Sequence, residues 1–327
     1  MSDTILDISD LHVEYASRDR CVKAVDGVSL SIERGSVLAL VGESGCGKTS
    51  TALAVLGLLP DVVHKVSGQV RFEGRDLMSL SDDELRRVRG REISMISQDP
   101  VSGLNPVLTV GQQVEEIITA HTPATKRETR RTVNDALERV GLVDPERLTR
   151  QYPYSLSGGM CQRVIIAIAT VLSPRLIIAD EPTSALDVTV QAGILSELER
   201  LRREQGVTIL LITHDMGVVA QMADDVAVMS AGRIAEEAPT KELFRRPRHP
   251  YTWSLLSSLP RVDRDRRPLE TIRGAPPDLT ELPDECAFVP RCPKAVMECR
   301  IKVSPALKEI APGHRAACYN PVYHAEE

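Results

Sequence analysis

Hydrophobic and polar residues alternate along much of the first forty positions, as in the stretches 5–8, 11–15 and 25–32. Alternation with a period of two is typical of strands that bury one face. Further strands are expected at 37–41, 69–72, 92–97, 176–179, 207–213, 226–229 and 233–236, and helices at 50–59, 110–140, 164–172 and 190–204. Strands that alternate with helices along a chain predict an α/β fold.

The residues after the apolar strand 37–41 form a glycine-rich stretch, Gly42-Glu43-Ser44-Gly45-Cys46-Gly47-Lys48-Thr49. A strand, a glycine loop and a helix, in this order, are what a phosphate-binding loop requires. The glycines let successive N–H groups turn inward toward phosphate oxygens, and the helix N-terminus adds the positive end of its dipole. In such a loop Lys48 reaches the terminal phosphates and Thr49 offers its hydroxyl to Mg²⁺. A glycine turn without a ligand is the alternative, which the flanking strand and helix disfavour.

Polar side chains follow three of the predicted strands. Gln98 comes after the strand 92–97, Asp180 and Glu181 come after 176–179, and His214 comes after 207–213. Ligands of open α/β sheets bind at the carboxyl ends of the strands, so Asp180 is expected to hold Mg²⁺ and Glu181 to polarise an attacking water. His214 is expected to contact a γ-phosphate rather than to act only as a structural hydrogen-bonding group. Gln98 suits Mg²⁺ or a water, although taken alone it equally suits a solvated loop.

A second helix start of the same kind lies at Ser157-Gly158-Gly159. Ser157 is a natural N-cap, and the two glycines leave N–H donors exposed at the helix start. No lysine accompanies this site, and one phosphate chain rarely needs two such helix termini. We therefore expect it to serve a nucleotide held by another subunit.

Composition narrows the class of protein. The chain has 327 residues, 42% hydrophobic and 26% charged, with a formal net charge of −6, which gives no reason to expect a nucleic-acid partner. The longest purely apolar run, 164–172, is too short to span a bilayer, and the first residues do not resemble a signal peptide. A cytoplasmic protein with reduced or metal-bound cysteines is expected. Beyond residue 245 the chain becomes rich in proline, which predicts an irregular extension held together by something other than a large core.

Taken together, these motifs resemble the ATP-binding subunit of an ABC transporter, over about residues 4–240. The family's motifs stand in the family's order, with Leu156-Ser-Gly-Gly-Met as the signature and Ile178-Ala-Asp-Glu as the acidic motif. The tail motif His249-Pro-Tyr-Thr resembles the oligopeptide/dipeptide importer branch, and Tyr152-Pro-x-x-Leu-Ser resembles the first of its two ATPase types. The resemblance implies a RecA-like core in an ABC ATPase domain at 1–245, with a helical subdomain at about 105–170. It also implies a C-terminal domain at 246–327.

By motif position, the resemblance also implies a role for each site residue. Tyr15 would stack on adenine. The alternative is that Tyr15 is only a half-buried aromatic residue of a strand. Residues Gly42 to Ser50 would bind the phosphates, and Thr49, Gln98 and Asp180 would serve Mg²⁺. Glu181, His214 and Lys48 would be the catalytic groups, and Asp187 would lie between subunits. Cys161 and Ser97 depart from residues common in the branch, which affects expected local packing more than expected activity.

The resemblance further implies a second ATPase subunit, two membrane permease subunits and an extracytoplasmic solute-binding protein as partners, with this chain at the cytoplasmic face of the membrane. The function expected is ATP hydrolysis that powers import of di- or oligopeptides. A nickel or other small-solute importer of the same branch is the alternative, because no residue of an ATPase chain reads the solute. A soluble ABC ATPase and a scaffold without turnover are disfavoured, the scaffold because Glu181 and His214 are present.

Four of the seven cysteines, Cys286, Cys292, Cys299 and Cys318, lie in the C-terminal extension. Metal is the expected partner of clustered thiols in a reducing compartment. Structural zinc sites usually contain a short Cys-x₂₋₄-Cys pair, which is absent here, whereas four thiolates are what a [4Fe–4S] cluster takes. Some members of the importer branch carry such a cluster, so a structural [4Fe–4S] cluster is predicted. Zn²⁺ and four free thiols are the alternatives, and His314 could replace one ligand.

Overall fold

The computed structural model describes residues 3–17, 20–100, 102–184, 186–259 and 272–323. The chain forms two compact units. The first consists of residues 1–5, 32–36 and 79–212, and the second of residues 6–31, 37–78 and 213–327.

The strands of the first unit are short, parallel and buried. β6 (Ile93–Ile96), β7 (Leu176–Asp180) and β8 (Thr208–Thr213) stand side by side in the order β8-β7-β6. Ile96 is paired with Ala179, and Asp180 with Ile212, so the carboxyl ends of the three strands reach one edge. Every residue of β7 and β8 is buried, which explains why the sequence here is a continuous apolar run.

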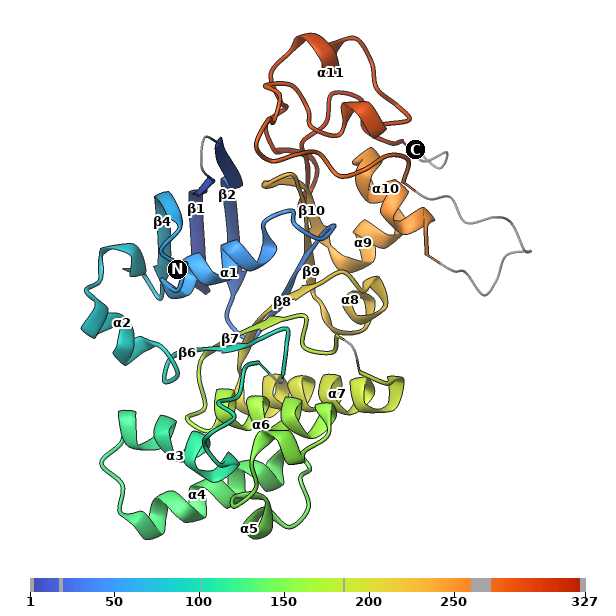
Figure 1. Ribbon diagram of the computed structural model, residues 1–327. Helices are drawn as coiled ribbons and strands as arrows, with labels where there is room; N and C mark the ends of the chain where they lie inside the picture. Colours follow the sequence, from blue (N-terminus) through green and yellow to red (C-terminus); the bar gives the residue numbers. More distant parts are fainter. Residues whose placement is uncertain (1–2, 18–19, 101, 185, 260–271, 324–327) are drawn as a thin grey trace. The chain divides into compact units, whose positions relative to one another are not determined.

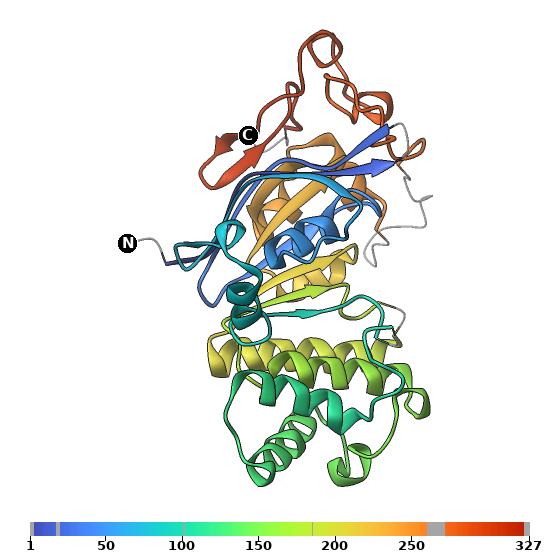
Figure 2. The same ribbon diagram turned by 60° about the vertical axis from the view of Figure 1, so that its left-hand side comes forward.

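Helices make up most of the rest of the first unit. They are α2 (Asp82–Val88), α3 (Val110–His121), α4 (Lys126–Arg139), α5 (Pro145–Leu148), α6 (Gly158–Thr170) and α7 (Val188–Gln205), with the 3₁₀ turns η1 (Leu77–Ser79), where the two units meet in sequence, and η2 (Pro153–Ser155). α3, α4 and α6 pack together, and Figures 1 and 2 show α7 alongside α6. The predicted helical stretch 110–140 is divided in two, because Pro123 interrupts it and Thr125 caps the second helix with a capping box.

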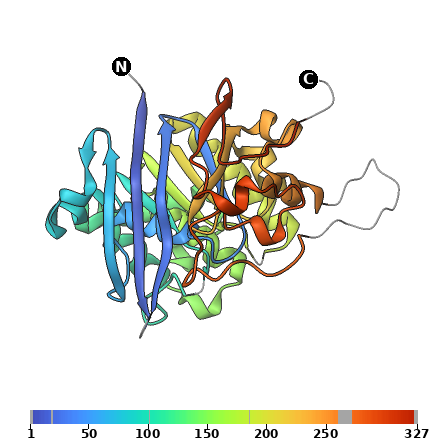
Figure 3. The same ribbon diagram turned by 90° about the horizontal axis from the view of Figure 1, so that it is seen from above.

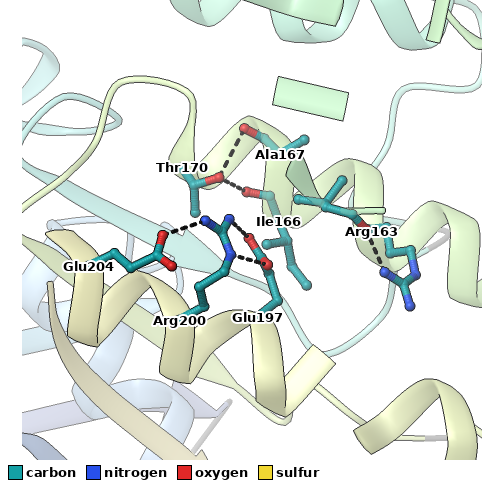
Figure 4. Close-up of polar contacts among 8 residues, drawn as sticks. Arg163, Ile166, Ala167, Thr170, Glu197, Arg200 and Glu204 are labelled. Atoms are coloured by element: carbon teal, nitrogen blue, oxygen red, sulfur yellow. Dashed lines mark hydrogen bonds and ion pairs between the residues drawn. The ribbon is translucent and has the colours of Figure 1, made fainter. Parts of the chain in front are cut away.

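Arg163, which follows the signature glycines on α6, joins three helices of this unit. Its guanidinium donates to the carbonyl of Val140 at the end of α4, and Arg163 is labelled in Figure 4. A Cβ atom built on Gly193 of α7 would lie 2.8 Å from Arg163 Nη2, so the guanidinium approaches the backbone of α7 closely there. On α7 itself, Arg200 bridges Glu197 and Glu204 (Figure 4).

The second unit contains an antiparallel sheet near its start. Its strands are β1 (Thr4–Ser17), β2 (Arg20–Glu33), β4 (Val63–Phe72) and β5 (Arg75–Asp76), in the order β2-β1-β4-β5, and Figure 3 shows β1, β2 and β4 side by side. On β1, Leu6, Ile8, Leu11 and Val13 are buried, whereas Asp7, Ser9 and His12 are partly exposed. Strands are therefore confirmed at the predicted positions, although the stretches 5–8 and 11–15 belong to the single strand β1.

A second group of strands in this unit has the order β11-β12-β10-β9-β3. They are β3 (Val37–Val41), β9 (Asp225–Ser230), β10 (Arg233–Pro239), β11 (Lys308–Ala311) and β12 (His314–Ala316). The helices are α1 (Lys48–Leu56), α8 (Met216–Met222), α9 (Thr240–Arg245), α10 (Pro250–Ser257) and α11 (Glu298–Ile301), with the 3₁₀ turn η3 (Val289–Arg291). β3 and β9 are parallel, and α9 and α10 lie against β10 (Figure 1).

Residues beyond 245 share the core of the second unit. Tyr251 and Phe288 pack in one buried cluster with Val41 and Val228, and β12 pairs with β10. The predicted division of the chain at 245/246 stays a prediction, and the two compact units do not follow it. None of the helices in the described part of the chain is both long and apolar enough to cross a membrane.

Candidate functional site

The glycine loop lies where the sequence predicts it, between β3 and α1 of the second unit. Gly47 has a φ of 108°, and a Cβ atom there would lie 2.1 Å from the carbonyl oxygen of Ala24. A Cβ atom on Gly42 would lie 2.1 Å from the carbonyl oxygen of Met229. Both positions therefore require glycine. Because Gly47 is also the N-cap of α1 and offers no side chain, no side chain caps the first N–H groups of this helix, which remain suited to an anion.

Lys48, the first residue of α1, is folded back over the loop and is buried. Its Nζ atom donates to the carbonyl oxygens of Gly42 at 2.8 Å and Glu43 at 2.9 Å. The Sγ atom of Cys46 lies 3.8 Å from the same ammonium group. The positive charge is thereby held within the curve of the loop, as a phosphate-binding lysine requires.

Tyr15 of β1 lies beside the start of α1. Its hydroxyl group is 3.0 Å from the Oγ atom of Ser50, and its ring is half-buried. An accessible aromatic face next to a phosphate loop suits a base-stacking role, since a half-exposed ring can stack on a nucleobase. Stacking of Tyr15 on adenine stays a prediction.

The acidic pair stands at the end of β7 in the first unit. Asp180 is the last residue of the strand and has an exposed fraction of 2%, and Glu181 has an exposed fraction of 9%. Glu181 has a φ of 49°, which is rare for a residue other than glycine, and its N–H donates to the carbonyl of Ile212 at 2.8 Å. A left-handed residue costs of the order of 1–3 kcal/mol. Five other non-glycine residues of the described chain also have a positive φ, so the catalytic role of Glu181 stays a prediction.

Gln98 and His214 also follow strands, as predicted. Gln98 is exposed just beyond β6, on the edge where β7 ends, and His214 is exposed just beyond β8. Hydroxyl, amide and carboxylate oxygens are ligands that Mg²⁺ accepts, so the donor set of Thr49, Gln98 and Asp180 fits the ion. Thr49 belongs to the second unit and the other two to the first. The Mg²⁺ site stays a prediction.

The signature motif forms an open helix start. Ser157 is the N-cap of α6 and its Oγ atom accepts from the N–H of Met160 at 3.3 Å, as predicted. A Cβ atom on Gly158 would meet nothing within 4 Å. A Cβ atom on Gly159 would lie 2.9 Å from Val190 of α7, and the carboxylate of Asp187 caps that helix through the N–H groups of Thr189 and Val190. The signature and Asp187 thus lie together.

The two departures from the branch pattern are accommodated by local packing. Cys161 is buried, and its thiol lies 3.6 Å from the carbonyl oxygen of Pro153. Burial raises the pKa of this thiol, so it is a neutral packing group. A Cβ atom on Gly103 would lie 2.7 Å from the Oγ atom of Ser97, so the loop after Gln98 approaches Ser97 closely. Neither residue is placed to replace a predicted catalytic group.

The four C-terminal cysteines line one pocket, together with His249, Pro250 and Phe288. Burial raises the pKa values of Cys286 and Cys292, and that of Cys318 to about 12. Within the described ranges, no group of three or more His, Cys, Asp or Glu side chains is arranged to hold a metal ion. The predicted metal-stapled extension is therefore not supported by the positions of these side chains, although four thiols around one pocket are a donor set that an iron–sulfur cluster accepts.

His314, the spare metal ligand in the sequence analysis, has another role. It is fully buried, and its Nε2 atom is 2.6 Å from the carboxylate of Glu236. Glu236 also accepts from the backbone N–H groups of Arg248 at 2.6 Å and His249 at 2.8 Å. A buried carboxylate with three donors, and the apolar core around Tyr251, hold the extension to β10.

Two residues that the sequence analysis did not single out as site residues contact the phosphate loop. The hydroxyl group of Tyr251 accepts from the N–H of Glu43 at 2.9 Å, and Arg291 forms two hydrogen bonds with the Glu43 carboxylate at 2.9 and 2.8 Å. Tyr251 was noted only as part of a tail motif, and no sequence pattern marks Arg291. Contacts between residues so far apart in the chain leave no local periodicity to read.

Parts of this chain match two known protein families. Residues 25–184 match the family described as ABC transporter, and residues 235–299 match the family described as oligopeptide/dipeptide transporter, C-terminal region. Among solved structures, the chain is similar to the dimeric structure of a bacterial ABC transporter cassette, with a TM-score of 0.65 and 29% identity. It is equally similar in fold to an ATP-binding cassette in a post-hydrolysis state bound to ADP and Pi, with a TM-score of 0.65 and 27% identity. Each match covers 72% of this chain and 98% of the other.

Curated relatives match nearly the whole chain. The dipeptide transport ATP-binding protein DppD of Bacillus subtilis is 45% identical over 99% of this chain and 97% of its own length. The oligopeptide transport ATP-binding protein OppD of Escherichia coli is 42% identical over 98% of this chain and 94% of its own length. The fold, the phosphate loop and these matches agree with the resemblance noted in the sequence. The chain therefore belongs to the ABC transporter family of ATPases, in the branch that carries the oligopeptide/dipeptide transporter C-terminal region.

Proposed function

We propose that this chain is the ATP-hydrolysing subunit that powers import of di- or oligopeptides through a membrane ABC transporter. The observation that carries the proposal is similarity over nearly the full length, extension included, to proteins named for dipeptide and oligopeptide transport. The phosphate loop, with its buried lysine and uncapped helix start, supplies the site for ATP. No contact among the described residues supports the alternative, an importer of nickel or another small solute.

In this proposal, residues Gly42 to Ser50 hold the phosphates of ATP and Tyr15 stacks on its adenine. Thr49, Gln98 and Asp180 hold Mg²⁺, which neutralises charge on the phosphates when it is bound. Glu181 accepts the proton of the attacking water, and Lys48 and His214 stabilise the charge that develops on the γ-phosphate.

The proposed function also implies partner subunits. The open helix start at Ser157, Gly158 and Gly159 bears no lysine, so it suits the ATP of a second ATPase subunit of similar sequence, with Asp187 beside it at the subunit boundary. The similar bacterial ABC transporter cassette was solved as a dimer, which supports a pair of cassettes. Two permease subunits and an extracytoplasmic binding protein complete the transporter, with this chain peripheral at the cytoplasmic face.

Reconstitution distinguishes the substrate classes. The chain, its partner ATPase and the permeases are placed in vesicles with the cognate binding protein, and ATP turnover is measured with dipeptides, with longer peptides and with Ni²⁺. Stimulation by peptides supports the proposal. Stimulation by Ni²⁺ alone, with peptides inert, replaces it with the small-solute alternative.

A finer part of the proposal concerns the cysteines. In this proposal Cys286, Cys292, Cys299 and Cys318 hold a structural [4Fe–4S] cluster, which rests on the number of thiols around one pocket and not on their arrangement. Anaerobically purified protein should be brown with about four irons per chain. Cys299→Ser should lower the iron content, whereas Cys21→Ser, at an exposed cysteine outside the extension, should not. Stoichiometric zinc would retain a metal site and exclude the cluster, and protein without metal would exclude both.

A further inference from the structure

We propose that Tyr251 and Arg291 are positioning residues that hold the phosphate loop in its binding shape through Glu43. All of these residues belong to the second compact unit. The inference rests on the proposed binding of ATP phosphates by this loop.

Three groups of Glu43, its N–H, its carbonyl oxygen and its carboxylate, form hydrogen bonds with other residues. Its N–H donates to the Tyr251 hydroxyl at 2.9 Å, its carboxylate accepts two hydrogen bonds from Arg291, and its carbonyl oxygen accepts from Lys48 Nζ at 2.9 Å. The N–H of Glu43 is therefore directed at protein and not at a phosphate. Because the same peptide segment carries one of the two carbonyl contacts of Lys48, a shift of Glu43 displaces the ammonium group that is expected to meet the terminal phosphates.

The two residues that hold Glu43 are themselves fixed. Tyr251 is fully buried, and its N–H donates to Nδ1 of His249, the N-cap of α10. The side chain of Arg291 has an exposed fraction of 5%. The ring of Phe288 packs edge-on against Tyr251 at 5.4 Å between centroids, and the Arg291 guanidinium lies 5.4 Å from the centroid of the same ring. A planar guanidinium bound at both oxygens of a carboxylate has little conformational freedom. Tyr251 and Arg291 therefore hold Glu43 in place before any ligand binds.

Charge supplies a second reason for Arg291. Glu43 places a carboxylate, one quarter exposed, on a loop that is expected to bind polyanionic phosphates. A buried guanidinium at 2.8–2.9 Å neutralises this charge. Without Arg291, the carboxylate would repel the phosphates and would be released to move. Loss of both charges together should therefore harm binding less than loss of Arg291 alone.

The test measures the Kd of MgADP and of MgATP for the full chain, by displacement of a fluorescent ATP analogue. Arg291→Gln should weaken binding about tenfold, which corresponds to loss of a charged hydrogen-bonded pair. Tyr251→Phe, which removes only the hydroxyl group, should weaken it roughly fivefold. The double variant Glu43→Gln with Arg291→Gln should recover to within about threefold of the unsubstituted chain, because the unpaired carboxylate is gone.

Matched controls come from the same extension. Arg315→Gln breaks the pair of Arg315 with Glu237, and Tyr319→Phe removes a hydroxyl that donates to Val303, both away from the loop. Neither should change the Kd. Thermal unfolding of each variant separates loss of fold from loss of binding, and the rescue by the double variant is a result that general destabilisation does not produce.

Three outcomes would overturn the inference. They are an unchanged Kd in Arg291→Gln and Tyr251→Phe, tighter binding in Tyr251→Phe, which would mean that the hydroxyl competes with phosphate for the Glu43 N–H, and no rescue in the double variant. Lys48→Ala keeps this result separate from the proposed function. If Lys48→Ala also binds nucleotide normally, the assignment of the phosphate site itself is wrong. If Lys48→Ala loses binding while Arg291→Gln and Tyr251→Phe keep it, only the positioning role of Tyr251 and Arg291 is contradicted.

Discussion

Replacement of the buried Glu236 by glutamine should destabilise the second unit strongly. Oε1 of Glu236 accepts from the Arg248 N–H and from His314, and Oε2 accepts from the His249 N–H. Glutamine has the same shape but carries one NH₂ group. In either orientation that NH₂ group faces a donor, so at least one buried donor loses its acceptor and the others meet a neutral oxygen.

The magnitude follows from the burial of the site. Glu236 and His314 have no exposed surface, so water does not replace a lost partner. An unsatisfied buried donor costs about 1–3 kcal/mol, and breaking a buried charged network costs about 3–5 kcal/mol. We expect a loss of about 3 kcal/mol in the free energy of unfolding.

The natural assay is urea unfolding followed by tryptophan fluorescence. Trp253 is the only tryptophan in the sequence and lies on α10, where its N–H donates to the carbonyl of His249. The matched control is Glu237→Gln, at the next residue, whose partner Arg315 is 39% exposed, so that pair is worth less than about 1 kcal/mol. Equal losses in the two variants, at unchanged denaturant dependence, would refute the reasoning.

Three further outcomes are expected. Lys48→Ala should abolish nucleotide binding, whereas Glu181→Gln should keep binding and stop hydrolysis; near-normal turnover by Glu181→Gln, with an inactivated partner site, would exclude Glu181 as the general base. Turnover of the isolated chain should be low and should rise with addition of a similar ATPase subunit, and full activity independent of protein concentration would contradict the shared site. Burial lowers the pKa of His249 to about 4, so the folded state keeps it neutral while the unfolded state takes up a proton near pH 6.5. Stability should therefore fall between pH 6.5 and 4, by up to about 1.4 kcal/mol per pH unit, and His249→Asn should flatten this slope in urea titrations.

The local parts of the site could be predicted from the sequence. The strand 37–41, the loop after it and the N-cap at Ser157 each depend on neighbouring residues, so spacing and residue type were sufficient. The left-handed backbone at Glu181 could not be predicted, because glutamate does not favour it and the bond to Ile212 that accompanies it comes from another strand. The bonds of Tyr251 and Arg291 to Glu43 depend on how α10 and η3 pack in the second unit, which no short-range pattern encodes.

The pairing of Arg291 with Glu43 can form only late in the synthesis of the chain. The two residues are 248 positions apart, so a ribosome has made the loop, β3 and α1 long before it makes the arginine. During that interval the growing chain carries a phosphate loop whose carboxylate has no guanidinium partner and whose Glu43 N–H has no phenol. If Tyr251 and Arg291 position the loop as proposed, a growing chain reaches its full affinity for nucleotide only after both residues have been synthesised and have packed against Glu43.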